Sequence, residues 1–397
     1  MASALADDPG NEVVAIVDQA SLHRAQRLYP RLRLCAYPSP QGAGTEIHHY
    51  LRSTESSVLR GQAVVRAALA LRNQGFTPNV ICAHPGWGEA LFLKDVFPAA
   101  KLVLYLEFYY RAQGSDMHFD PEFPSSFDDA CRIRLRNTTQ LLSLESADAA
   151  ISPTHWQRAQ YPAMVQERIS VIHDGVNTDI VCPGPVVNFQ LPHFGGSLNS
   201  GDEVITYVAR NLEPYRGIHK FLRALPEILA ARPHARVLVV GGDAVSYGRA
   251  APKGETYRSL YMKELAGKVD AGRIHFLGKL PYPQYLQVLR LSSAHVYLTY
   301  PFVLSWSMLE AMSCGCLLIG SSTAPVREVL QHERNGLLVD FHDPSALAKM
   351  VIHALAHPQE MVPLRRQARI DAQARFDLKR VCLPQLKAFV QLGKAFQ

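Results

Sequence analysis

The feature of this chain that most constrains its fold is a regular alternation of two hydropathy patterns. Short β-branched and apolar runs, such as EVVAIV at 12–17 and VITYVA at 204–209, alternate with longer stretches of helical periodicity. This alternation is typical of parallel β-sheets whose strands are joined by crossover helices. The sequence therefore predicts an α/β fold.

The apolar runs form two series, one in each half of the chain. In the first half we expect helices at 49–74 and 126–146, and strands at 12–17, 32–36, 79–83, 101–106 and 148–151. The second series starts at 204–209 and continues through RVLVVGG, RIHFLG, HVYLTY, CLLIG and GLLVD. We therefore expect two doubly wound, Rossmann-like domains that face a cleft, with ligands beyond the carboxyl ends of the strands.

A length of 397 residues suits two such domains better than one core. Residues 186–200 are rich in Pro, Gly and Ser and have no periodicity, so they are expected to form a linker. The expected layout is an N-terminal acceptor-side domain at 1–185, a C-terminal domain at 201–357 and C-terminal helices at 358–397.

Composition favours a cytoplasmic protein. No apolar run approaches the ~20 residues that span a bilayer, and the first residues lack the basic and apolar regions of a secretory signal. The seven cysteines are scattered and do not suggest a disulfide framework. The close pair Cys314 and Cys316 lies in an apolar turn without further ligands nearby, so packing is favoured over metal binding.

Charge is distributed unevenly along the chain. Residues 1–185 carry 16 Lys and Arg against 19 Asp and Glu, whereas the remainder carries 25 against 16. The basic half suits an anionic ligand or an anionic membrane surface. Nucleic acid is not expected as a partner, because no basic run is interleaved with aromatic residues.

Two arginines are the first candidate site residues. The strand VITYVAR ends in Arg210, and the loop NLEPYRG brings Arg216 and Gly217 to the start of the next helix. Guanidinium groups bind phosphate oxygens bidentately, and a helix N-terminus favours negative charge. We expect a diphosphate clamp here, with solvated surface arginines as the alternative.

The segment YPFVLSWSMLEAMSCG supplies a second set of candidates. It predicts a strand, a loop and then a helix that begins near Ser305 or Ser307, with Glu310 one turn inside. A carboxylate at this place can accept hydrogen bonds from both ribose hydroxyls. The alternative is an acid that is favoured only by the helix dipole. The expected donor-binding residues of the loop are Val303, Leu304, Ser305, Trp306 and Ser307.

In these motifs the sequence resembles retaining glycosyltransferase family 4. The segments VIHDGVNTDI, VARNLEPYRG, the GGD after RVLVV, LEAMSCG and NGLLVDFHDP occur in the family's order, and the resemblance covers about 165–355. It implies the GT-B architecture with a group 1 C-terminal domain. It also implies that Arg210 and Arg216 neutralise the leaving diphosphate and that Glu310 binds the ribose. The first Glu of the family's E-x7-E element is replaced by Phe302, so the usual sugar contact cannot be carried over.

The N-terminal half resembles a subgroup of the same family through HPGWGEALFLKDVFP and LYLEFYYRAQGSDMHFDPEF. His84 and Glu107 are expected to be catalytic or acceptor-side residues, with turn or buried structural roles as the alternatives. Three further residues are candidates for the acceptor side: Trp87, Glu89 and Tyr109. Together with Phe108 and Tyr110, the aromatic residues offer faces for stacking, although core packing also explains them.

The start of the chain departs from the family, because only ASALADDPG precedes EVVAIVD. Family members have a further strand there, so this domain is expected to lack its first strand and to leave a sheet edge exposed. The last segment, 358–397, is expected to cross back to the first domain. Its alternation of basic and apolar residues also suggests peripheral contact with the inner membrane face.

The expected reaction moves a sugar from a nucleoside diphosphate to a hydroxyl of a glycan, lipid or small molecule, with retention at the anomeric carbon. Stabilisation of the leaving group would dominate. No D-x-D triplet occurs, so no metal or other cofactor is expected. The alternatives are an epimerase or a phosphorylase on the same scaffold and an inactive nucleotide-sugar-binding relative. A dehydrogenase is disfavoured, because no G-x-G-x-x-G follows a strand.

Overall fold

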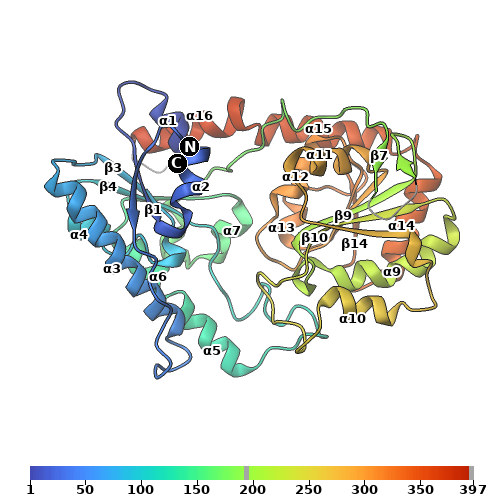
Figure 1. Cartoon of the computed structure of the whole chain (residues 1–397), viewed down its shortest axis with the longest axis horizontal. Coiled ribbons are helices and arrows are strands. Elements are labelled where there is room, and N and C mark those ends of the chain that lie inside the picture. Colours follow the sequence, from blue (N-terminus) through green and yellow to red (C-terminus); the bar gives the residue numbers. More distant parts are fainter. Residues whose placement is uncertain (192–195, 393–397) are drawn as a thin grey trace. The chain divides into compact units, whose positions relative to one another are not determined.

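A computed structural model describes residues 1–191 and 196–392 of the chain. It divides into two compact units (Figure 1). The first contains Met1–Asp174 together with the segment that begins at Cys382, and the second contains Gly175–Val381.

The second unit is built on a six-stranded parallel sheet in the order β11-β10-β9-β12-β13-β14. Its strands are β9 Val204–Asn211, β10 Arg236–Gly242, β11 Ile274–Gly278, β12 Ala294–Tyr297, β13 Leu318–Ser321 and β14 Leu337–Val339. Its main helices are α9 Ile218–Ala231, α10 Tyr257–Glu264, α11 Tyr282–Leu291, α12 Trp306–Ser313, α13 Ala324–Arg327, α14 Pro344–Ala356 and α15 Val362–Phe376. The strand order reverses between β9 and β12. In a doubly wound sheet this reversal marks where a ligand binds, beyond the carboxyl ends of those two strands.

The central strands of this sheet are covered on both faces, which explains their continuous apolar sequence. Val204 and Ile205 of β9 and Val296 of β12 are fully buried. The buried hydroxyl of Thr206 on β9 is paired, since it lies 2.8 Å from Nδ1 of His295 on β12. The α/β prediction for this half is confirmed.

The first unit contains two separate parallel sheets. One has four strands in the order β3-β4-β5-β6, and the other pairs only β1 with β2. The strands are β1 Val14–Asp18, β2 Arg33–Tyr37, β3 Val80–Ala83, β4 Lys101–Tyr105, β5 Ala149–Ser152 and β6 Ile169–Val171. The helices are α1 Ala2–Ala6, α2 Leu22–Leu28, α3 Arg52–Asn73, α4 Leu93–Val96, α5 Phe127–Arg136, α6 Thr138–Ser146, α7 His155–Gln160, α8 Ala163–Gln166 and α16 Leu383–Leu392.

The segment expected as a linker belongs to the second unit, because the chain divides between Asp174 and Gly175. Its short strands β7 (Phe189–Gln190) and β8 (Ser197–Leu198) pair in antiparallel fashion. Val186, Leu191 and Leu198 are buried and pack with residues of β9 and β10. Composition therefore misplaced the boundary, since a segment rich in Pro and Gly still anchors itself through a few apolar side chains. Residues 192–195 of the expected linker lie outside the described residues.

The C-terminal segment is shared between the two units. Helix α15 and residues up to Val381 belong to the second unit, whereas α16 belongs to the first. There Leu386 and Phe389 pack with Val103 and Ile151 of β4 and β5. Across the two described stretches of chain, no helix is both long enough and apolar enough to span a membrane.

Candidate active site

Arg210 and Arg216 lie at or just after the end of β9, beside the reversal of strand order in the second unit, but their environments differ. Arg210 is exposed near the end of β9 and has no hydrogen-bond or ion-pair partner among the described residues. Arg216 lies in the turn after β9 and is 7% exposed. The alternative of a solvated surface arginine therefore fails for Arg216.

The guanidinium of Arg216 is held by neutral groups. Its Nη1 donates to Oγ1 of Thr299 at 2.9 Å and to the carbonyl of Val303 at 3.0 Å. Its Cζ also lies 5.3 Å from the ring centroid of Tyr247 and 5.9 Å from that of Phe302. Among the described residues, no carboxylate lies within salt-bridge distance of it. A buried cation without a countercharge is costly, so this place favours an anion.

Gly217 shapes the entry into α9. It has φ of +70°, and a Cβ at this position would lie 2.5 Å from Cβ of Leu298 and 3.0 Å from the ring of Phe341. Only glycine fits both the left-handed backbone and the space. Gly217 therefore allows α9 to begin directly after the turn that carries Arg216.

The loop before α12 offers fewer free amides than expected. Ser305 is the N-cap of α12, and its hydroxyl accepts the amide of Ser307 at 3.3 Å. The amide of Ser305 itself donates to the hydroxyl of Tyr297 at 2.7 Å. For Val303, Leu304 and Trp306, no amide partner is found within the described parts of the chain. These three amides remain the candidates for a phosphate or sugar oxygen.

Glu310 lies in α12, and both of its oxygens are occupied. Tyr282 donates its hydroxyl to one oxygen at 2.7 Å, and Tyr285 donates to the other at 2.7 Å. Both tyrosines come from α11, and burial raises the pKa of each. They therefore act as neutral donors that hold the carboxylate. Sequence reasoning missed them, although their i, i+3 spacing at the start of a helix after a strand was a usable signal.

Phe302 occupies the position where the family has a carboxylate, and it is buried among aromatic rings. Its ring centroid lies 4.8 Å from Tyr247 and 5.5 Å from Tyr215. The nearby acid that sequence reasoning missed is Glu213, which is fully buried. Its carboxylate accepts the backbone amides of 246–248 at 3.0–3.1 Å, so it fixes the loop that carries Tyr247. Its place between Arg210 and Arg216 was the only available signal.

In the first unit, His84 and Glu107 come together at the carboxyl ends of β3 and β4. Nδ1 of His84 accepts the amide of Gly86 at 3.1 Å, so the proton of the neutral ring is on Nε2. Nε2 lies 3.2 Å from a carboxylate oxygen of Glu107 and can donate to it. The Glu107 side chain is 46% exposed, so it can also meet a ligand.

The other acceptor-side candidates have differing environments. Trp87 is exposed and stacks over His84 at a centroid distance of 6.5 Å, whereas Tyr109 is half-buried against Tyr161. Phe108 is buried and stacks on Trp156 at 6.0 Å, so it belongs to the core.

Glu89 ties elements of the first unit together. It accepts hydrogen bonds from the hydroxyl of Tyr37 at 3.2 Å and from Arg60 at 3.4 Å. These partners come from the end of β2 and from α3.

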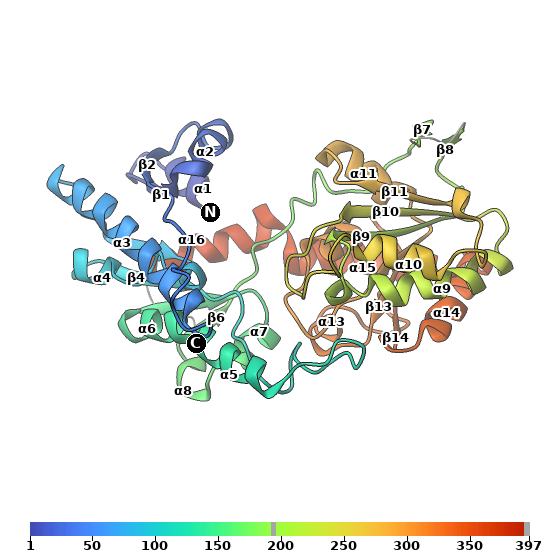
Figure 2. The ribbon, with the colours of Figure 1, turned by 60° about the horizontal axis from the view of Figure 1, so that its bottom comes forward.

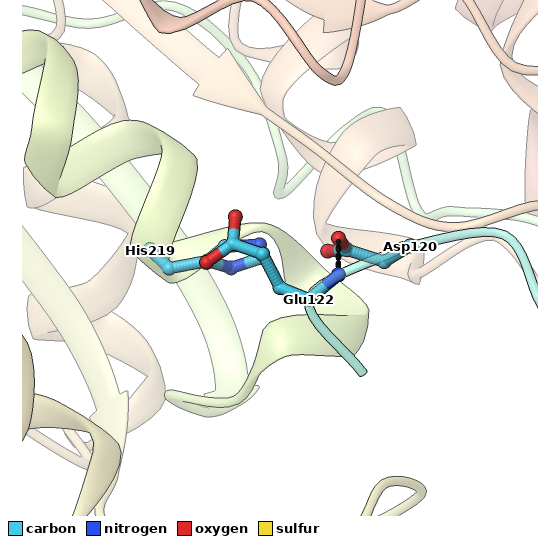
Figure 3. Close-up of side chains that lie close together, drawn as sticks. All are labelled: Asp120, Glu122 and His219. Atoms are coloured by element: carbon cyan, nitrogen blue, oxygen red, sulfur yellow. Dashed lines mark hydrogen bonds between the residues drawn. The ribbon is translucent and has the colours of Figure 1, made fainter. Parts of the chain in front are cut away.

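Figure 3 labels three further residues that bear potential ligand atoms. In the first unit, Asp120 accepts the backbone amide of Glu122 at 3.1 Å, which closes a local turn. In the second unit, His219 of α9 is fully buried, with Tyr261 at a ring distance of 5.7 Å. Asp120 and Glu122 thus belong to the first unit, and His219 belongs to the second.

The fold is that of the GT-B glycosyltransferases, which have two Rossmann-like domains. A glycosyltransferase from Rickettsia africae aligns with a TM-score of 0.69 at 13% identity and covers 98% of this chain and 92% of that chain. HepE from Anabaena, solved with UDP and glucose, aligns with a TM-score of 0.63 at 17% identity and covers 95% of this chain and 92% of that chain. Sucrose-phosphate synthase from Thermosynechococcus elongatus aligns with a TM-score of 0.67 at 18% sequence identity. It covers 96% of this chain and 98% of that chain.

Within this class, two family models match the chain. The glycosyl transferase family 4 group model matches residues 9–181, and the glycosyl transferases group 1 model matches residues 191–375. The chain belongs to the family 4 type of GT-B glycosyltransferases.

The curated relatives align with only part of this chain and at low sequence identity. A D-inositol 3-phosphate glycosyltransferase from Corynebacterium efficiens is 25% identical over 60% of this chain and 53% of its own length. One from Thermobispora bispora is 27% identical over 50% of this chain and 45% of its own. This chain thus spans about half the length of the curated relatives it matches.

Proposed function

We propose that this chain transfers a sugar from a nucleoside-diphosphate sugar to a hydroxyl acceptor, with retention at the anomeric carbon and without a metal. The observation that carries the proposal is the buried guanidinium of Arg216, which meets only neutral groups. A diphosphate would supply the missing negative charge at the place where doubly wound sheets bind ligands.

Arg210 completes the anion site in this proposal. Its exposed side chain lies near the end of β9, just before the turn that carries Arg216, and is not engaged by any described residue. As the bond to the sugar breaks, negative charge grows on the leaving phosphate. The guanidiniums of Arg210 and Arg216 and the amides near Val303 would stabilise that charge, which is the main contribution that such a site can make.

Glu310 would bind the ribose of the donor. Its two tyrosine partners fix the carboxylate, and each oxygen can accept more than one hydrogen bond. On the acceptor side, Glu107 with His84 would bind a hydroxyl of the acceptor. The sequence has no obvious paired-carboxylate motif for a double displacement, so the leaving phosphate would take the acceptor proton itself.

The first compounds to test follow from the relatives. HepE was solved with UDP and glucose, and the curated relatives are named for D-inositol 3-phosphate. UDP-sugars as donors and polyol phosphates as acceptors are therefore the first pairs in a panel that also includes glycans and lipids.

The proposal is tested by incubating the protein with this panel in EDTA and measuring released nucleoside diphosphate and mass-shifted product. We expect activity in EDTA and, for Arg216→Met, a loss of kcat/KM of about 100-fold or more, since removing one charged transition-state contact costs about 3 kcal/mol. Arg236→Met, at the amino end of β10 and away from the site, is the matched control. Activity abolished by EDTA would refute metal-free transfer, and full activity of Arg216→Met would refute the anion site.

One observation favours a second candidate. Phe302 replaces the carboxylate that the family uses near the donor sugar, and it is buried among aromatic rings. An inactive nucleotide-sugar-binding protein would bind nucleoside diphosphate and release none in the same assay. An epimerase would instead convert the donor sugar without any acceptor.

A further inference from the structure

The second unit contains a cavity of about 570 Å³ that lies away from the candidate active site. Its lining comes from 183–185, the start of β9, the ends of α11 and α14 and the start of α15, and these elements are labelled in Figure 2. Glu203 precedes β9 and Ser293 precedes β12, so the cavity lies at the amino ends of these strands. Arg210 and Arg216 lie at or just after the carboxyl end of β9. The two places are therefore at opposite edges of one sheet.

The cavity has the size and access of a small-molecule site. Pockets for small ligands usually enclose ~300–1,000 Å³. Pro185 and Pro358 of the lining are exposed, so a ligand can reach the cavity from solvent. Leu355 and Met361 contribute buried apolar side chains to its wall. An apolar wall with a few polar groups is typical of ligand pockets.

The charged residues of the described lining are two arginines and one glutamate. Glu203 is paired with Arg232, which lies outside the lining and whose Nε donates to the carboxylate at 3.2 Å. Arg290 and Arg365 have no carboxylate within salt-bridge distance among the described residues. The lining therefore carries two positive charges that no ion pair within the described chain balances.

Both of these guanidiniums keep N–H groups that no described residue engages. Nε of Arg290 donates to the carbonyl of Cys182 at 2.9 Å, and its Nη2 donates to that of Ile180 at 3.2 Å. Nε of Arg365 donates to the carbonyl of Gly315 at 2.7 Å. Across the described chain, no partner is found for Nη1 of Arg290 or for either Nη of Arg365. Because a guanidinium has five N–H donors, each arginine can still bind a ligand.

Gly184 leaves the Arg290 side chain uncovered on one side. A Cβ at position 184 would lie 3.5 Å from Nε and 3.6 Å from Cζ of Arg290. Gly184 also lines the cavity, so no side chain from this position covers the guanidinium. In contrast, the hydroxyl of Ser293 is already engaged, because it donates to the carbonyl of Asp202 at 2.8 Å. The arginines are therefore the donors that the cavity offers to a ligand.

We infer that this cavity binds a small metabolite that bears a phosphate monoester. Such a group carries nearly two negative charges at neutral pH and has three acceptor oxygens, so it can balance both arginines. A carboxylate has one charge and two oxygens, which a single guanidinium fork already satisfies. The apolar wall and the volume suit the organic part of the ligand. The inference does not depend on the proposed function, because it concerns the other edge of the sheet.

The test uses ribose 5-phosphate as the probe and ribose as its uncharged control. Isothermal titration calorimetry with the full chain should show binding of ribose 5-phosphate and none of ribose. Arg290→Gln and Arg365→Gln should each raise the Kd about tenfold or more, because each removes hydrogen bonds to a charged group. Arg366→Gln is the matched control. It makes the same charge change on the same helix at an exposed residue outside the lining, and it should leave the Kd unchanged.

Arg216→Met separates the cavity from the candidate donor site, and it should also leave the Kd for ribose 5-phosphate unchanged. Binding that is lost in Arg216→Met and kept in Arg290→Gln and Arg365→Gln would place the probe at the donor site and overturn the inference. The inference would equally fail if ribose 5-phosphate did not bind, or if ribose bound as tightly.

A measurement on the unaltered chain covers the case in which a variant does not fold. Amide hydrogen exchange is compared with and without ribose 5-phosphate. Exchange should become slower at 182–186 and 290–293, which border the cavity, and stay unchanged at 210–217. Slower exchange at 210–217 alone would contradict binding in the cavity.

Discussion

At the residue scale, a substitution of Glu310 tests whether its carboxylate binds a ligand or only stabilises the fold. Glu310→Gln keeps the shape but removes the charge that accepts from two tyrosines. We expect the donor KM to rise about tenfold or more, because hydrogen bonds to a charged group contribute about 1.5–3 kcal/mol. Steady-state kinetics with the donor varied measure the effect. Tyr282→Phe, which removes one partner and keeps the carboxylate, is the control. A loss of thermal stability with unchanged KM would assign Glu310 a structural role.

His295 gives the second unit a pH-dependent stability. Burial lowers its pKa from 6.5 to about 4, so the folded protein holds it neutral while the unfolded chain protonates it below 6.5. Its contribution is therefore complete above pH 6.5 and lost as pH falls toward 4, by up to about 3 kcal/mol. Urea unfolding on either side of pH 6.5 measures this loss. We expect His295→Val to show a shallower pH dependence, and equal slopes would contradict the assignment.

At this scale the type and position of a residue in the sequence predicted candidate site residues, but not which residues they contact. Arg210, Arg216 and Glu310 could be singled out because each stands where a strand ends or a helix begins. Glu213 and Tyr285 had weaker signals, and their partners could not be found, because their contacts come from loops and helices distant in the sequence. Likewise, nothing local shows that Phe302 is buried against Tyr247.

At the element scale, the start of α9 depends on Gly217. An alanine there would combine a left-handed backbone with a Cβ 2.5 Å from Leu298. We expect Gly217→Ala to lower the free energy of unfolding by about 3 kcal/mol, the sum of backbone strain and overpacking. Gly254→Ala is the matched control, because Gly254 has φ of +85° and no atom within 4 Å of a Cβ. It should cost about 1 kcal/mol. Equal losses in the two variants, measured by denaturant unfolding, would exclude the steric contribution.

Element positions were predictable where the apolar runs were strong and less so elsewhere. The helix expected at 126–146 is two helices, because the side chain of Asn137 bonds both the amide and the carbonyl of Tyr110 and turns the chain. An exposed sheet edge was expected only from the resemblance to the family, because a run of apolar residues does not encode that β1 and β3 lie in separate sheets. The expected linker failed for the same reason, since three distant apolar contacts decide its place.

At the scale of the whole molecule, the chain leaves the first unit once and returns to it in α16. Phe389 is fully buried in a cluster with Val103, Ile151 and Ile172. Phe389→Ala should therefore destabilise the first unit by about 3–5 kcal/mol, the usual cost of such a truncation. Hydrogen exchange should become faster in β4 and β5 and stay unchanged in the sheet of the second unit.

Phe127→Ala is the control for that experiment, because Phe127 is 85% exposed in the same unit. It should leave exchange in both sheets unaltered. If Phe389→Ala accelerated exchange equally in both units, they would unfold as one cooperative body, and the return of the chain would couple them energetically. If exchange changed in neither, α16 would not contribute to the core of the first unit. Faster exchange confined to the first unit is expected because, among the described residues, the cluster around Phe389 contains none of the second unit.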